Sequence, residues 1–211
     1  MKKLFTSESV TPGHPDKLCD KIADMILDAY LKEDSSSRVA VEVCAHKNGI
    51  VVMGEVTSKA KIDIERIVRN TIIDVGYDND NLGFNGNNVK VSININTQSN
   101  DIAMGVNTSS DSKLLGAGDQ GMMFGYACDE TPELMPISIS LAHKLSKRLA
   151  EVRKDGTISY LRPDGKTQVT IEYDNDIPVR VDTVVVSTQH ADYISLDKIR
   201  NIGIMAHIDA G

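Results

Sequence analysis

Three kinds of chemically useful side chain lie within the seven residues TPGHPDK, 11–17. His14 can carry a proton, Asp16 can bind a cation and Lys17 can neutralise an anion. The stretch has two interpretations. In the first it is only a helix start, because proline suits the first turn of a helix and an aspartate there favours the positive end of the helix dipole. In the second, the three side chains bind a charged ligand.

A second candidate site involves two glutamates in the valine-rich segment 38–58. The pair Asn48–Gly49 predicts a hairpin with a two-residue turn. That turn places Glu42 directly opposite Glu55, and like charges in such positions destabilise a sheet. The pair therefore lies either on an exposed, solvated face or at a cation site, where a metal ion or a substrate ammonium group relieves the repulsion.

Two further motifs could contact a ligand. In GAGDQG, 116–121, glycines allow close approach of a ligand to the backbone beside Asp119, although a tight turn capped by Asp119 explains the motif too. RPDGK, 162–166, carries Asp164 and Lys166, and P-D-G is also a common hairpin turn. Each motif, taken alone, is compatible with a purely structural role.

Hydrophobic periodicity predicts the elements that hold these residues. Apolar residues recur at helical spacing in 16–34, 61–76 and 136–154. Strands are expected in 38–58, 88–99, 120–128, 157–173 and 178–189, with 157–173 a hairpin around Pro163–Gly165. Because strands and helices do not alternate regularly, the sequence predicts an α+β fold with antiparallel or mixed sheets packed against helices.

Composition narrows the class of protein. The chain has 211 residues, 41% of them hydrophobic and 25% charged, with a formal net charge of -7, as expected for a folded globular protein. Without a basic stripe, nucleic acid is not an expected partner. No apolar run approaches the length of a membrane span and no signal peptide is visible, so a cytoplasmic location is expected. Cys19, Cys44 and Cys128 are interpreted as buried, reduced thiols and not as a disulfide or zinc set.

TPGHPDK, GAGDQGMMFGYA and LRPDGKTQVTIEY occur in this order, with FTSESV ahead of them and VVVSTQH behind. Over roughly residues 3 to 200 the sequence closely resembles the methionine adenosyltransferase, or S-adenosylmethionine synthetase, family. The resemblance implies an enzyme that joins methionine to ATP, displaces the entire triphosphate and hydrolyses it to pyrophosphate and phosphate. It also implies Mg²⁺ and K⁺ as cofactors, three similar α+β domains, and sites between subunits of a homodimer or homotetramer.

The resemblance implies roles for the residues on the phosphate side. A highly charged polyphosphate leaves, so electrostatic stabilisation of the leaving group should dominate catalysis. Three catalytic residues would provide it: His14, Lys17 and Lys166. ATP would bind through His14, Asp164 and Lys166, and Asp16 would hold Mg²⁺.

The resemblance also implies roles on the methionine side. Methionine would bind through Glu55, Gln98 and Asp119, and Glu42 would hold K⁺. These assignments would give each of the two glutamates a cation. A lid over 98–108 would close over the site and exclude water, which strengthens electrostatic interactions.

The resemblance implies an N-terminal domain at 1–100, a lid or linker at 101–115 and an incomplete central domain at 116–199, with the third domain missing. The ending 200–211 looks foreign to the family. It resembles the start of a translational GTPase of the elongation factor G type, but it stops before the lysine of that phosphate loop. We therefore expect a truncated methionine adenosyltransferase, with a non-catalytic dimerising or binding fragment as the alternative and a GTPase fragment less favoured.

Overall fold

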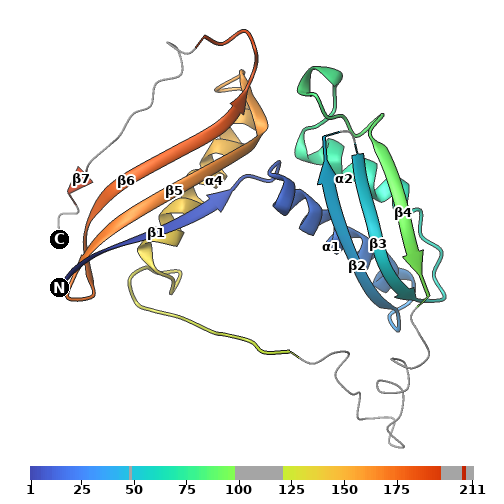
Figure 1. The fold of residues 1–211 in the computed structure, drawn as a ribbon, viewed down its shortest axis with the longest axis horizontal. Helices are drawn as coiled ribbons and strands as arrows, with labels where there is room; N and C mark the ends of the chain where they lie inside the picture. The colour runs from blue at the N-terminus through green and yellow to red at the C-terminus, as the bar shows by residue number, and fades with distance from the viewer. Residues whose placement is uncertain (48, 98–120, 196–205, 208–211) are drawn as a thin grey trace, which may run out of the picture.

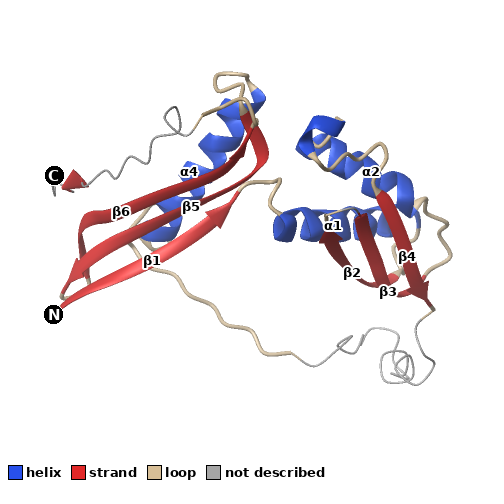
Figure 2. Cartoon of the chain, turned by 45° about the horizontal axis from the view of Figure 1, so that its top comes forward, coloured by secondary structure: helices blue, strands red, loops and turns tan. Residues whose placement is uncertain are grey.

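The computed structural model describes residues 1–47, 49–97 and 121–195, and the backbone of 206–207. Within them the chain forms two units, each a small sheet with helices packed on one side (Figure 1). Figure 2 shows α1 and α2 against the sheet of β2, β3 and β4, and α4 against the sheet that contains β1, β5 and β6. None of the described helices is long and apolar enough to cross a membrane.

The first unit contains a three-stranded sheet in the order β2-β3-β4. Its elements are α1 (Pro15–Glu33), β2 (Arg38–His46), β3 (Gly49–Thr57), α2 (Ile64–Val75), the 3₁₀ helix η1 (Asp80–Leu82) and β4 (Lys90–Asn96). β2 and β3 are antiparallel, whereas β3 and β4 are parallel and α2 connects them. A parallel pair of strands needs such a crossover connection. Because the sheet contains one antiparallel and one parallel pair, it is mixed, as the sequence predicted.

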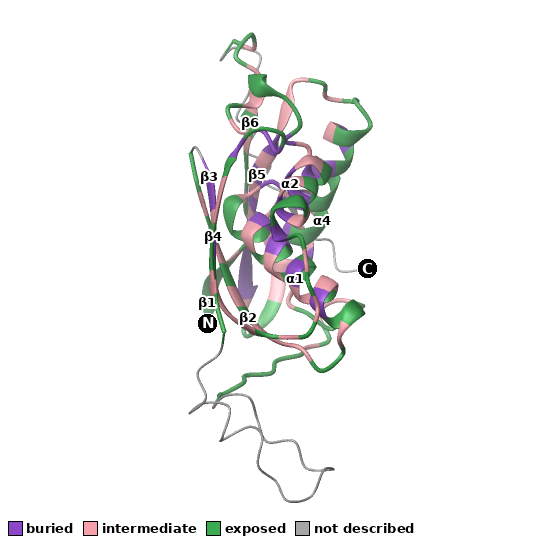
Figure 3. Cartoon of the chain, turned by 90° about the vertical axis from the view of Figure 1, so that its right-hand side faces the viewer, coloured by how far each residue is buried: buried purple, intermediate pink, exposed green. Residues whose placement is uncertain are grey.

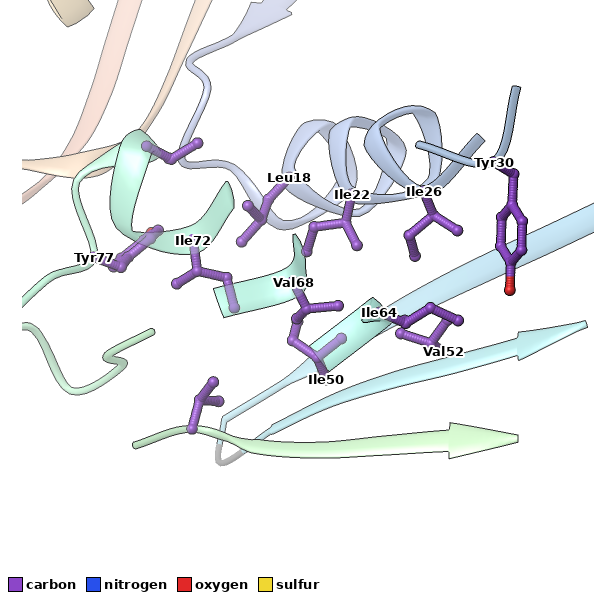
Figure 4. Packing of buried hydrophobic residues seen from close by; sticks show 12 residues of the cluster. Leu18, Ile22, Ile26, Tyr30, Ile50, Val52, Ile64, Val68, Ile72 and Tyr77 are labelled. Carbon is purple, nitrogen blue, oxygen red and sulfur yellow. The ribbon is translucent and has the colours of Figure 1, made fainter. Parts of the chain in front are cut away.

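The core of the first unit lies between its helices and the inner face of its sheet. Leu18, Ile22 and Ile26 recur on one side of α1 and are buried. They belong to one buried cluster with Ile50 and Val52 of β3 and with apolar residues of α2 (Figure 4). In Figure 3 the buried residues gather along this inner surface. Burying one such side chain stabilises the fold by about 1.5–3 kcal/mol, so these contacts fix how α1 lies on the sheet.

The second unit contains a four-stranded antiparallel sheet in the order β1-β5-β6-β7. Its elements are β1 (Lys2–Val10), α4 (Ile137–Lys154), β5 (Leu161–Asp174), β6 (Ile177–His190) and β7 (Ala206–His207). β1, which the sequence analysis did not predict, precedes the first unit along the chain yet pairs with β5, with Lys2 opposite Asp174 and Val10 opposite Lys166. The segment that follows β1 therefore crosses from one unit to the other.

The predicted register of the first hairpin is wrong. His46 pairs with Gly49, so Glu42 lies opposite Met53 and Glu55 lies opposite Ala40. Gly49 is the first residue of β3 and is closely surrounded: a Cβ there would come 2.7 Å from both His46 Nε2 and Lys90 O. The shift is two residues, and side chains alternate with a period of two, so both glutamates remain on one face.

The predicted hairpin around Pro163–Gly165 is also wrong. β5 runs without a turn from Leu161 to Asp174, with a register shift between Leu161 and Gly165. The turn falls at Asn175 and Asp176, whose φ angles of 51° and 65° suit a two-residue hairpin. Both residue types tolerate this left-handed backbone, which explains why the chain reverses there.

The strand predicted at 120–128 does not form in its described part. Residues 121–128 have no regular secondary structure, and Met122, Met123 and Phe124 are exposed. The apolar run is therefore not part of a core within the described chain. The three predicted helices are confirmed as α1, α2 and α4, with boundaries that differ by a few residues.

Candidate phosphate-binding site

The structure joins two of the motifs that the sequence analysis singled out. The amide of Thr11 donates to Gly165 O at 2.9 Å, and its hydroxyl donates to Pro163 O at 2.8 Å. Thr11 is buried, so these bonds are shielded from water. They hold TPGHPDK against RPDGK although the bonded residues are 152 and 154 positions apart. The first motif enters α1 and the second lies in β5, so the junction also links the two units.

His14 caps the N-terminus of α1. Its Nδ1 accepts a hydrogen bond from the amide of Asp16 at 3.3 Å. The helix-start interpretation of this turn is thus confirmed. The ligand-binding interpretation remains open beside it, because a neutral imidazole that accepts at Nδ1 carries its proton at Nε2 and can donate it to a ligand oxygen.

Asp16 presents an exposed carboxylate beside that imidazole. Its side chain is 89% exposed, while that of His14 is 18% exposed, and Asp16 Oδ2 lies 3.8 Å from His14 Nδ1. Mg²⁺ commonly binds proteins through one or two carboxylates together with substrate phosphates and water. The largely exposed carboxylate of Asp16 fits the carboxylate part of that pattern. Within the described residues, no group of three or more metal-ligating side chains forms a preassembled cage.

Two lysines approach the same junction. Lys17 donates from Nζ to Val10 O at 2.6 Å, at the end of β1. Lys166 lies in β5 opposite Val10 and forms an ion pair with Glu8, Nζ to Oε1, at 2.9 Å. The hydrogen bond and charge of Glu8 raise the pKa of Lys166 above its ordinary value, and the nearby carboxylates of Asp16 and Asp164 raise it further. Lys166 therefore stays positively charged at neutral pH.

Glu8 is a site residue that the sequence analysis missed. Its partnership with Lys166 depends on the pairing of β1 with β5, for which no local pattern gives evidence. The available signal was its position in FTSESV, one of the segments on which the family resemblance rested. The ion pair with Glu8 holds the charged end of Lys166 beside β1.

The two predicted cation-binding glutamates lie elsewhere. Residues of β2 and β3 that alternate with the core positions face away from α1 and α2, and Glu42 and Glu55 are among them. Within one chain the junction at the start of α1 and these carboxylates therefore occupy different surfaces. Gln98, Asp119 and the lid segment 98–108 lie outside the described residues, as does the tail apart from the backbone of 206–207.

Comparison with known protein families shows which family the chain belongs to. Residues 2–100 match the N-terminal domain of S-adenosylmethionine synthetase, and residues 114–210 match its central domain. The chain belongs to the S-adenosylmethionine synthetase family. The motifs brought together in the junction come one from each matched domain, so this family member places its two domains in contact there.

Curated relatives agree with the family assignment. The chain is 59% identical over 206 residues to the S-adenosylmethionine synthase of Nocardia farcinica, which covers 93% of this chain and 51% of the relative. It is 56% identical over 207 residues to that of a Parafrankia species and 55% identical over 207 residues to that of Clostridium botulinum. These matches cover 93% and 94% of this chain, and 52% and 53% of the relatives. The chain thus spans about half the length of these S-adenosylmethionine synthetases.

Proposed function

We propose that this protein takes part in forming S-adenosylmethionine from ATP and methionine, with displacement and hydrolysis of the triphosphate. The observation that carries the proposal is the junction of TPGHPDK with RPDGK, where His14, Lys17 and Lys166 gather around one end of β1. A chain of phosphates needs several positive or donating groups along its length. The junction offers them within one chain.

On the phosphate side, His14 and the two lysines stabilise the negative charge of the phosphates. His14 donates from Nε2 to a phosphate oxygen, while Lys17 and Lys166 neutralise the charge that grows on the leaving polyphosphate. Such groups are effective when they are already held in place, and the hydrogen bonds of Lys17 to Val10 and Lys166 to Glu8 hold them. Asp164 binds ATP beside Lys166. Asp16 would hold Mg²⁺, which supplies further charge neutralisation for the phosphates.

On the methionine side, Glu55 binds the substrate ammonium and Glu42 holds K⁺, with Gln98 and Asp119 as further methionine contacts. An exposed carboxylate such as that of Glu42 can serve as an oxygen ligand for a hard cation. Because these glutamates face away from α1, a complete site needs a second surface. We propose that a second copy supplies it, in a homodimer or a homotetramer located in the cytoplasm.

Product formation by the 211-residue chain tests the proposal, with ATP, methionine, Mg²⁺ and K⁺ present. We expect S-adenosylmethionine to form, and we expect Lys166→Ala to lower the rate roughly ten- to hundredfold, because a charge-assisted contact to phosphate is lost. Folding should change little, since the Lys166–Glu8 ion pair is exposed at the surface. Product is measured by chromatography and folding by circular dichroism.

Lys3→Ala is the matched control. Lys3 also lies on β1's sheet and forms an exposed ion pair, with Asp176, but at the opposite end of the strand. Equal loss of activity in both variants would contradict the site assignment. Binding of ATP or methionine without product would instead support a non-catalytic binding form.

A further inference from the structure

Tyr77 connects the end of α2 directly to the turn that carries His14. It follows the C-terminus of α2, where Gly76 has a φ of 114° and ends the helix. Its hydroxyl donates to Gly13 O at 2.8 Å, and its side chain packs edge-on against Phe84 with ring centroids 5.4 Å apart. Tyr77 is only 7% exposed, so this bond lies in a site shielded from water.

The bond fixes one particular peptide group. Gly13 O belongs to the peptide unit whose nitrogen is that of His14, and that nitrogen donates to Thr11 O at 3.0 Å. Both ends of the Gly13–His14 peptide are therefore hydrogen-bonded, one to Tyr77 and one within the turn. Since a peptide unit is planar, fixing both ends fixes the plane that leads to His14 Cα. The next peptide is held as well, because Leu18 N donates to His14 O at 2.9 Å, so the two peptides together set the direction of the His14 Cα–Cβ bond.

Gly13 is also in contact with the second motif, RPDGK. A Cβ at Gly13 would come 2.4 Å from Pro163 C, O and Cβ, so the two backbones are in direct contact. Only glycine allows this approach, because any side chain would separate the motifs. Tyr77 and Pro163 thus both contact Gly13.

Tyr77 is itself rigidly placed. Its carbonyl accepts from Gly86 N at 2.9 Å and its amide donates to Ile72 O at 3.1 Å. Arg153 of α4 donates to Val75 O at 2.8 Å, two residues before Tyr77, and so ties this corner to the second unit. Burial, assisted by the charge of Asp164, raises the pKa of Tyr77 above its ordinary value. The phenol stays protonated and remains a hydrogen-bond donor.

We propose that Tyr77 is a positioning residue for His14: its hydroxyl holds the Gly13–His14 peptide so that the imidazole faces the phosphates gathered at the junction. This inference rests on the proposed function in so far as it names a phosphate ligand. Whatever ligand the junction binds, the order of the turn at 11–17 depends on one hydroxyl group, that of Tyr77, in the other half of the first unit.

The test compares Tyr77→Phe with Tyr173→Phe in the full 211-residue chain. Tyr173 is a matched control because it is 5% exposed and its hydroxyl donates at 2.8 Å to Glu130, away from the junction. Hydrogen exchange is followed at the amides of His14 and Leu18, which bond to Thr11 O and His14 O. Affinity for inorganic tripolyphosphate with Mg²⁺ is measured by calorimetry.

We expect Tyr77→Phe to raise exchange at these two amides and to weaken tripolyphosphate binding about five- to tenfold, as for the loss of one buried hydrogen bond. Tyr173→Phe should change neither. Unchanged exchange in Tyr77→Phe would overturn the inference. So would faster exchange that extends equally to the amides of Val68 and Ile72 in the core of α2, because Tyr77 would then support the fold and not the turn.

The two proposals fail in different ways. Wild-type protein that does not bind tripolyphosphate contradicts the proposed function, while the exchange rates still decide whether Tyr77 orders the turn. Wild-type protein that binds, together with Tyr77→Phe that binds equally well, contradicts the positioning role and leaves the proposed function standing.

Discussion

At the scale of single residues, His14 serves the fold and the proposed site with different atoms. Nδ1 caps α1 by accepting from the amide of Asp16, which leaves Nε2 for a ligand. The division has a physical basis, because a histidine that is held at one nitrogen has a fixed tautomer and a fixed ring orientation. The structural and functional interpretations of this turn are therefore compatible, and the helix cap prepares the side chain for the proposed chemistry.

A second residue, Asp34, leads to a prediction about how the stability of the fold depends on pH. It ends α1, and its carboxylate accepts hydrogen bonds from Ser36 and from the amide of Lys59 at 2.9 Å. These bonds, those from Ser36 foremost, lower the pKa of Asp34 from 3.8 to about 2. Because the pKa of Asp34 is lower in the folded state, its ionised carboxylate stabilises the fold at pH values above the unfolded-state pKa of 3.8. That contribution is lost as the pH falls through about 2.

Asp34→Asn should therefore unfold more readily than the wild type at pH 7, and the difference should shrink between pH 4 and pH 2. Urea unfolding followed by circular dichroism at a series of pH values measures both free energies. A difference that stays constant over this range would show that the charge of Asp34 contributes nothing.

At the scale of elements, the hairpin of β2 and β3 depends on one glycine. Gly54 has a φ of 139°, and a Cβ there would come 2.0 Å from Ala40 O across the hairpin. The close approach sets the separation of the two strands beside Glu55. A side chain at this position would force β2 and β3 apart, and it would displace Glu55, the next residue of β3.

Gly54→Ala should destabilise the protein by more than about 3 kcal/mol, towards the upper end of the range for single substitutions. Gly83→Ala is the control: Gly83 also has a positive φ, of 70°, but no atom lies within 4 Å of its Cβ position. That variant should lose only about 1–2 kcal/mol, the cost of a left-handed backbone. Similar urea midpoints for the two variants would mean that strand contact at Gly54 is unimportant.

At the scale of the whole molecule, the proposed site has two halves on different surfaces of one chain. His14 and Lys166 lie at the junction, and Glu55 lies on the outer face of the first sheet. A homodimer in which the junction of one copy meets the sheet face of the other would contain two complete sites. Closed two-fold assemblies form such reciprocal contacts.

Mixing two inactive variants tests this arrangement. His14→Ala and Glu55→Ala chains, unfolded together and refolded, should recover roughly a quarter of wild-type activity, because half of randomly formed dimers are mixed and each has one unaltered site. A mixture of His14→Ala and Lys166→Ala chains is the control and should show no more activity than the two variants refolded separately, since both changes alter the same half. No recovery in the first mixture would contradict a site shared between copies.

The sequence by itself determined the local features of this protein. The apolar spacing in α1, α2 and α4 identified the helices, because helical periodicity depends on residues that are three or four positions apart. It also identified the family, since the motifs keep their order and spacing along the chain. The candidate residues His14, Asp16 and Lys166 came from the same motifs.

Only the tertiary structure decided which distant segments meet. β1 pairs with β5 across more than half of the chain, and this pairing brings Glu8 to Lys166 and Thr11 to Pro163. No local periodicity encodes such a choice, because every strand offers the same backbone donors and acceptors. The hairpin register was also beyond the local pattern: a shift of two residues preserves the hydrophobic pattern, so that pattern does not distinguish the two pairings.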